Sequence, residues 1–192
     1  MTAMRPAVFL DRDGVIIENR AGYVRSWEDV EFLPDALQAL VQLALTPYAI
    51  VIVTNQSVVG RGLLSLEKAQ KINQGVIDRI LQAHGRVDGA YLCPHAPQDQ
   101  CDCRKPKPGL LTQAAIELDL DLINSIMIGD ALTDLSAAEA AGIQHKILVL
   151  TGRGAEQARL PEAKTLFPFE SYPSLSAAVQ AILEDGPDRK YL

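Results

Sequence analysis

The chain has 192 residues, 48% of them hydrophobic and 22% charged, and a formal net charge of −6. These values are typical of a globular protein that buries a full core, so we expect one domain over residues 1–192. The acidic balance argues against broad binding to nucleic acid or to an anionic membrane. No apolar run approaches the about 20 residues that span a bilayer, and residues 1–6 lack the apolar core of a signal peptide, so we expect a cytoplasmic protein.

Apolar runs alternate with helical patterns along the chain. Buried strands are predicted at residues 7–10, 49–53, 89–92, 123–128 and 146–150, with a weaker sixth strand near 166–167. Helices are predicted at about 35–46, 65–84, 109–118, 133–141 and 174–184, and residues 18–27 and 60–62 are expected to be loops. This alternation predicts an α/β fold, a doubly wound parallel sheet of Rossmann-like type with helices on both faces, in three layers.

Two carboxylates follow the first predicted strand. Asp11 and Asp13 are one residue apart, so they can face the same way, and Gly14 lets the backbone turn directly after them. Like charges held together are costly unless a cation or a proton separates them. Mg²⁺ is the usual cation for an all-oxygen site. Taken alone, this spacing fits a strand followed by an Asx-type turn equally well.

The ends of the other strands add complementary groups. Thr54 and Asn55 follow the second strand, Lys105 lies beyond the third, and Asp130 and Asp134 follow the fourth. Because the carboxyl ends of parallel strands lie at one edge of the sheet, we expect these groups to converge there. A hard-metal site beside a cation and neutral donors suits chemistry on a phosphate, where charge is neutralised and the reacting groups are held in line.

All three cysteines lie in one short segment. With a histidine they form two tight pairs, Cys93 with His95 and Cys101 with Cys103. Such clustering favours a metal over a disulfide framework, and a Cys₃His set is typical of a closed, structural zinc site. Free cysteines in a loop are the alternative. A zinc ion would make the segment of about residues 93–108 rigid, and would place Arg104 and Lys105 over the phosphate site.

Together the motifs resemble those of the haloacid dehalogenase superfamily. They are Asp11-x-Asp13-Gly14, Thr54-Asn55, Lys105 and Gly129-Asp130-x-x-x-Asp134, and they occur in the family's order over most of the chain. The second aspartate indicates the phosphatase branch. The resemblance implies a single domain of haloacid dehalogenase type with no large cap domain and a small zinc-bound loop insertion.

The resemblance also implies catalytic roles. Asp11 would be the nucleophile, forming an aspartyl-phosphate, and Asp13 the general acid and then the general base. Thr54 and Asn55 would hydrogen-bond the phosphoryl oxygens, and Lys105 would neutralise negative charge on them and on Asp11.

A magnesium site is implied by the same resemblance. Mg²⁺ would be held by the carboxylate of Asp11, the backbone carbonyl of Asp13 and the carboxylate of Asp130. Asp134 would stand behind these ligands and orient water ligands or Lys105.

The zinc segment narrows the resemblance to two related groups of enzymes. Cys-Pro-His followed by Cys-x-Cys-Arg-Lys-Pro resembles the heptose 1,7-bisphosphate phosphatases and the histidinol-phosphate phosphatases. Gly22-Tyr23-Val24 and the run of residues 54–57 followed by Arg61-Gly62 favour the heptose group. Two features count against the heptose group: the short segment of five residues between His95 and Cys101, and Ala131 where some heptose phosphatases have a lysine. The resemblance therefore implies removal of the C7 phosphate of a heptose 1,7-bisphosphate, with histidinol phosphate or another small sugar phosphate as the alternative substrate.

The expected partner is a small phosphorylated sugar, bound by a monomer that binds neither nucleic acid nor a membrane. Its contacts are expected to come from loops at the active edge: Arg20, Gly22, Tyr23, Thr54, Asn55, Gln56, Ser57, Arg61, Arg104 and Lys105. The planar fork of arginine suits a second anionic group on the substrate. A receiver-like signalling module phosphorylated on Asp11 is the alternative from another class, and the acid–base group Asp13 argues against it.

Overall fold

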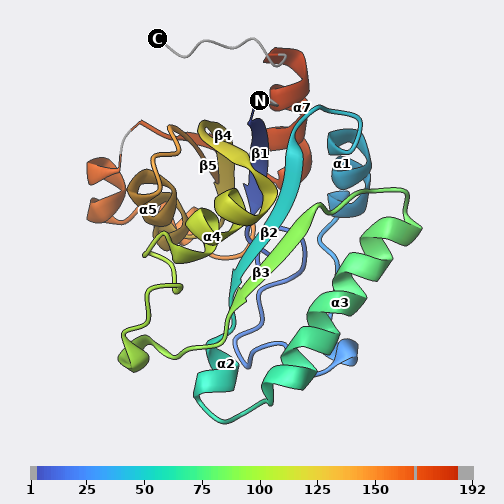
Figure 1. Cartoon of the computed structure of the whole chain (residues 1–192), viewed down its shortest axis with the longest axis vertical. Helices are drawn as coiled ribbons and strands as arrows, with labels where there is room; N and C mark the ends of the chain where they lie inside the picture. The colour runs from blue at the N-terminus through green and yellow to red at the C-terminus, as the bar shows by residue number, and fades with distance from the viewer. Residues whose placement is uncertain (1–3, 167, 186–192) are drawn as a thin grey trace.

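Figure 1 shows a computed structural model of the chain, which describes residues 4–166 and 168–185. One sheet of six parallel strands forms its centre, in the order β3-β2-β1-β4-β5-β6. The strands are β1 (Arg5–Leu10), β2 (Ala49–Asn55), β3 (Gly89–Cys93), β4 (Leu120–Gly129), β5 (His145–Val149) and β6 (Glu170–Tyr172). This order confirms the predicted doubly wound sheet.

Helices cover both faces of the sheet. The helices are α1 (Ala36–Leu43), α3 (Leu66–Gln82), α4 (Gly109–Leu118), α5 (Leu132–Ala140) and α7 (Leu175–Asp185), with short helices α2 (Ser57–Gly60) and α6 (Gly154–Gln157). In Figure 1, α1 and α3 lie on one side of the sheet and α4 and α5 on the other. Within the described residues there are also three 3₁₀ turns: Trp27–Asp29, Pro97–Asp99 and Pro161–Thr165.

The central strand β1 supplies both layers of the core, because successive side chains of a strand point to opposite faces. Val8 and Leu10 pack in the cluster that contains residues of α1, α3 and α7. Ala7 and Phe9 pack in the cluster that contains residues of α4 and α5. All four side chains are fully buried, so the end of β1 is held in place from both sides.

The sixth strand is not where the sequence predicted it. It spans Glu170–Tyr172, whereas Leu166 follows a 3₁₀ turn and packs beside a small apolar cluster that contains Leu132 and Leu148. The apolar character of residue 166 thus reflects this packing, and residue 167 lies outside the described residues. Residues 57–60 form a helical turn, α2, next to the predicted loop. No helix within the described ranges has the length and apolar character needed to cross a membrane.

Candidate active site

A hollow of about 210 Å³ lies at the carboxyl-terminal ends of β1, β2 and β4. The strand order reverses between β1 and β4, so the loops after these strands diverge and leave a crevice, as open α/β sheets do at such a point. The wall of this pocket consists of Asp11, Asp13, Asn19, Arg20, Tyr23, Val24, Asn55, Gln56, Ser57, Arg104, Lys105, Thr133, Asp134 and Arg153.

Lys105 joins the loops at the floor of the pocket. Its buried ammonium lies 2.8 Å from Asp11 Oδ1 and 2.7 Å from Asp134 Oδ1, and it donates to the Val53 carbonyl at 2.7 Å. An ammonium has three N–H donors, and the protein uses all three. Burial disfavours the charged form, but Asp11 and Asp134 outweigh it and raise the pKa of Lys105. Lys105 therefore neutralises Asp11, and no donor is left over in this arrangement for a phosphoryl oxygen.

Asp134 forms the second ion pair of the Lys105 ammonium. Its side chain is buried, and besides Lys105 it accepts a hydrogen bond from the backbone N–H of Ala131 at 3.1 Å. Burial raises the pKa of Asp134 to about 7, against the lowering effect of the Lys105 ammonium, and the charges of Asp11 and Asp130 act with burial. Asp134 is placed to fix Lys105, which is one of the two tasks predicted for it.

Asp130 is a fully buried carboxylate with one oxygen left over. Its Oδ2 accepts hydrogen bonds from the Arg153 backbone N–H at 2.9 Å and from Asn19 Nδ2 at 3.4 Å. Its Oδ1 has no hydrogen-bond partner among the described residues. Gly14 and Gly152, with φ of 89° and 55°, approach so closely that a Cβ on either would collide with Oδ2. Burial, and then the charge of Asp11, raise the pKa of Asp130.

These carboxylates fit a magnesium ion. Ligand oxygens of Asp11, Asp130 and Asp134 lie within 4.8 Å of one another. Lys105 pairs with one oxygen of Asp11 and one of Asp134. Buried Asp130 Oδ1 accepts no hydrogen bond among the described residues, and the Arg153 guanidinium lies 3.6 Å from it, so this oxygen is available to a metal ion. The oxygen-only donor set suits a hard divalent ion. Asp11 and Asp130 are the carboxylates that could hold it, because Asp134 pairs with Lys105. The part of the Asp13 carbonyl stays a prediction.

Asp13 is held by two neighbours. Arg12 donates through Nη2 to both carboxylate oxygens, at 3.1 and 3.0 Å, and Gln56 donates through Nε2 to Oδ2 at 2.7 Å. Arg12 is buried under the site, whereas the carboxylate of Asp13 faces the pocket. The same Nε2 of Gln56 also donates to Thr54 Oγ1 at 2.9 Å. Gln56, predicted as a substrate contact, thus links Asp13 to Thr54.

Asn55 ties β2 to the segment that carries Lys105. Its Nδ2 donates to the Lys105 carbonyl at 3.0 Å, and its Oδ1 accepts from the Lys105 backbone N–H at 3.1 Å. The amide is therefore engaged with Lys105 in this structure, and Thr54 is nearly fully buried. A contact of either side chain with a phosphoryl oxygen stays a prediction.

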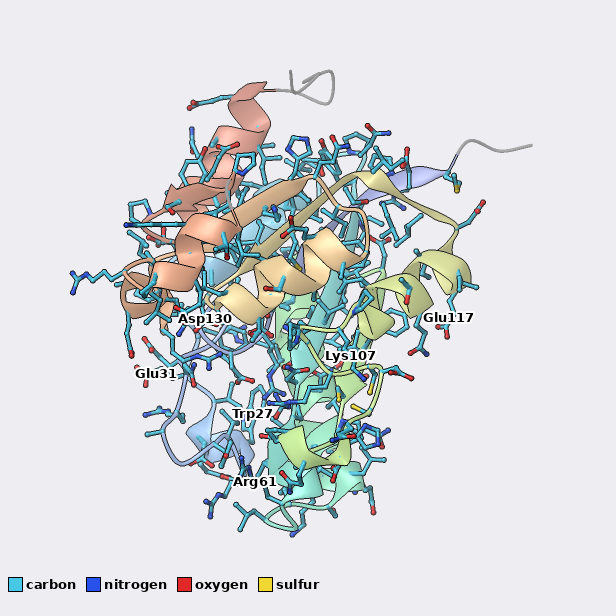
Figure 2. All side chains as sticks on the ribbon, turned by 90° about the vertical axis from the view of Figure 1, so that its left-hand side faces the viewer. Trp27, Glu31, Arg61, Lys107, Glu117 and Asp130 are labelled. Atoms are coloured by element: carbon cyan, nitrogen blue, oxygen red, sulfur yellow. The ribbon has the colours of Figure 1, made fainter. Side chains whose placement is uncertain are left out.

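The predicted substrate arginines do not all converge. Arg20 and Arg104 line the pocket, together with Tyr23 and Ser57, but Arg61 and Gly22 are absent from its wall. Figure 2 shows Arg61 far below Asp130, on the exposed turn after α2. Arg20 is half-exposed and pairs with Glu31 at 2.8 Å. Arg61 therefore lies outside the wall of this pocket, on the turn that follows α2, and its contact with the substrate stays a prediction.

The thiols and the imidazole of the Cys/His segment come together. Cys103 Sγ lies 3.1 Å from Cys93 Sγ, 3.5 Å from Cys101 Sγ and 3.3 Å from His95 Nδ1. Cys93 Sγ lies 3.6 Å from Cys101 Sγ and 3.7 Å from His95 Nδ1, and Figure 2 shows the sulfur atoms grouped just below Lys107. A tetrahedral zinc ion with Zn–S of about 2.3 Å needs S–S edges of about 3.8 Å. The four groups fit such an ion with small adjustments.

Four residues at the site were absent from the sequence-based prediction: Arg12, Asn19, Thr133 and Arg153. Arg153 follows β5 at the same sheet edge as the predicted groups, so the rule that located Asp130 would also have located it. Arg12 was hidden by its place between the two aspartates. Asn19 lies in a polar loop whose path no local pattern in the sequence indicates.

Fold and site together define a hydrolase of haloacid dehalogenase type. A family model described as HAD-hydrolase-like matches residues 102–171. The chain is 42% identical over 156 residues to a D-glycero-β-D-manno-heptose-1,7-bisphosphate 7-phosphatase of Vibrio cholerae, covering 78% of this chain and 83% of that protein. It is 43% identical over 156 residues to the enzyme of the same name from Haemophilus ducreyi, covering 78% and 85%.

Solved structures of similar fold point to the same family. The D,D-heptose 1,7-bisphosphate phosphatase of B. bronchiseptica, solved with magnesium and phosphate, superposes with a TM-score of 0.85 at 34% identity, covering 94% of this chain and 99% of that one. A HAD-like phosphatase structure from Mesorhizobium loti gives a TM-score of 0.79 at 29% identity, covering 98% and 90%. The chain belongs to the heptose-bisphosphate phosphatase family of the haloacid dehalogenase superfamily.

Proposed function

We propose that the protein is a Mg²⁺-dependent phosphatase that removes the C7 phosphate of D-glycero-D-manno-heptose 1,7-bisphosphate. The observation that carries the proposal is the pocket floor, where Lys105 holds Asp11 at 2.8 Å beside Asp130 Oδ1, a buried oxygen that accepts no hydrogen bond among the described residues. This arrangement offers a carboxylate nucleophile next to a carboxylate oxygen that could ligate a metal ion. The names of the relatives at 38–43% identity support the substrate.

The residues of the chain divide the reaction into two steps. In the first, an oxygen of Asp11 attacks phosphorus, the bond from phosphorus to the C7 oxygen breaks, and Asp13 gives its proton to the departing alkoxide. In the second, Asp13 takes a proton from water, whose oxygen attacks the phosphorus of the aspartyl-phosphate and releases Asp11 and inorganic phosphate. Asp11, Asp130 and the carbonyl of Asp13 would hold a magnesium ion, which would supply charge neutralisation at the phosphoryl group.

Lys105 and Asp134 prepare the nucleophile. The ammonium pairs with Asp11 and fixes its direction, and Asp134 helps to keep the ammonium charged and in place. Arg12 and Gln56 hold Asp13 at the mouth of the site, where it meets the leaving group. Each of these contacts exists before substrate arrives, so the site is preorganised for the reaction.

The proposal includes a structural zinc ion on Cys93, His95, Cys101 and Cys103. Their spacing supports it, and the segment has little apolar core of its own to fix its shape. Thiols that ligate a metal stay reduced in a reducing compartment, which supports a cytoplasmic location. We further infer that residues 1–192 act as one domain and as a monomer, with the small phosphorylated sugar as the partner.

The test is a comparison of three substrates with purified protein and Mg²⁺: heptose 1,7-bisphosphate, histidinol phosphate and p-nitrophenyl phosphate. We expect the highest kcat/KM with the bisphosphate, and ³¹P NMR should show loss of the C7 phosphate and retention of the C1 phosphate. Asp11→Asn serves as the inactive control. Equal or better turnover of histidinol phosphate would overturn the substrate, and a phosphorylated protein without turnover would indicate a signalling module.

A further inference from the structure

Arg153 differs from the other cationic side chains on the pocket wall in having no short partner of its own. Lys105 has all three donors engaged, Arg20 pairs with Glu31 at 2.8 Å, and Arg104 donates to the His95 carbonyl at 3.2 Å. The guanidinium of Arg153 lies 3.6 Å from Asp130 Oδ1, beyond hydrogen-bond distance, and 54% of its side chain is exposed. Of the cationic side chains that line the pocket, Arg153 is therefore the one that its protein contacts constrain least.

The backbone of Arg153 is anchored by a hydrogen bond, whereas its side chain has no short polar contact within the described residues. Its N–H donates to Asp130 Oδ2 at 2.9 Å, and Gly152 before it packs against the same carboxylate. The guanidinium faces Asp130 Oδ1, the buried oxygen that hydrogen-bonds to nothing else in the described structure. The guanidinium therefore lies beside the carboxylate oxygen that would ligate a divalent cation, and its backbone is anchored to the other oxygen of the same carboxylate.

A guanidinium and a divalent ion repel each other, so they do not share one carboxylate oxygen at close range. We propose that Arg153 and Mg²⁺ compete for Asp130, and that the cation displaces the guanidinium into the pocket, where it binds the second anionic group of the substrate. The identity of that group as a sugar phosphate rests on the proposed function. Arg153 would thus be a specificity residue whose availability depends on metal binding.

The competition predicts two opposite effects of one substitution. Arg153→Met removes a cation from Asp130, so Mg²⁺ should bind more tightly to the substrate-free protein, by about two- to fivefold, the scale of an exposed ion pair. The same variant loses a fork that grips phosphate, so KM for the bisphosphate should rise by about tenfold. For p-nitrophenyl phosphate, which has no second anionic group, KM should not rise.

The experiment combines calorimetric titration of the substrate-free protein with Mg²⁺ alone and steady-state kinetics with both substrates. Arg159→Met is the matched control, because Arg159 is also exposed, lies six residues further along, and is absent from the pocket wall. It removes the same charge and should change neither affinity nor KM. Arg153→Lys keeps the charge without the fork, so it should bind Mg²⁺ as the wild type does and lose part of the preference for the bisphosphate.

Unchanged or weaker Mg²⁺ binding in Arg153→Met would overturn the competition. An equal rise in KM for both substrates would overturn the role in specificity. If the wild type shows no preference for the bisphosphate, the proposed function fails, and the Mg²⁺ titration still decides whether Arg153 and the cation compete.

Discussion

Substitution of Asn55 should weaken both the fold and the reaction, because this side chain fastens Lys105 to the sheet. The amide makes two hydrogen bonds with the backbone of Lys105, at 3.0 and 3.1 Å. Each is worth about 1 kcal/mol net, so Asn55→Ala should lower the free energy of unfolding by about 2 kcal/mol. For a chain of this size that corresponds to a fall in Tm of about 4–8 °C.

The kinetic effect follows from the same contacts. Lys105 reaches Asp11 only because its backbone is held at the end of β2, so its release should lower kcat by roughly 10- to 30-fold, the equivalent of about 2 kcal/mol. Asn55→Asp keeps the acceptor for the Lys105 N–H but sets an anionic oxygen against the Lys105 carbonyl. It should be at least as damaging as alanine.

Thermal unfolding followed by circular dichroism, and turnover of p-nitrophenyl phosphate, measure the two effects. The matched control is Asn124→Ala, since the exposed amide of Asn124 donates only to Asp121. The control should change stability by no more than about 0.5 kcal/mol. If Asn55→Ala kept the Tm and the kcat of the wild type, the positioning of Lys105 through Asn55 would be refuted.

Four further outcomes test the rest of the site. Asp11→Asn should abolish turnover while keeping the Tm within a few degrees; activity in this variant would exclude a covalent intermediate. Cys103→Ser should lower bound zinc, measured by elemental analysis, and reduce kcat. In EDTA at pH 8, Lys105→Met should lower the free energy of unfolding by about 3–5 kcal/mol, since the buried carboxylates lose their partner. The pKa of Asp134 in the folded state is raised, to about 7 already in the wild type. Asp134 therefore takes up a proton as the pH falls toward 5, and the free energy of unfolding that the variant lost at pH 8 should be regained. Urea unfolding curves measure this change. Arg104→Ala should lower kcat/KM for the bisphosphate more than for p-nitrophenyl phosphate.

The parallel sheet could be predicted because its signal is local. Each buried strand is a continuous apolar run, as expected for strands covered on both faces, and the helices between them carry their own start and stop signals. Ser65, for example, accepts a hydrogen bond from the Lys68 N–H at the start of α3, as its position in the sequence indicated. The site followed from one geometric rule, since polar residues that end parallel strands meet at one edge.

Contacts between loops could not be predicted in the same way. Asn55 and Lys105 are 50 residues apart, and nothing in either segment shows that an amide would pair with that backbone. Arg61 gives a second example: Ser57 at the start of α2 lines the pocket, whereas Arg61 directly after α2 does not, and no local pattern indicates this difference. Loop path depends on packing between distant segments, and a single sequence contains no local record of it.

Lys105 explains why the Cys/His segment matters to a reaction at the sheet edge. A zinc ion on Cys103 would fix the chain two residues before Lys105, and Asn55 fixes the backbone of Lys105 itself. The ammonium then holds Asp11 from the segment and Asp134 from α5 in one buried network. The nucleophile is thus positioned from three separate parts of the chain. Loss of the metal should therefore lower catalysis before it unfolds the sheet. Cys93 packs in one core cluster of the sheet, but most residues of that cluster come from the strands and from α4 and α5.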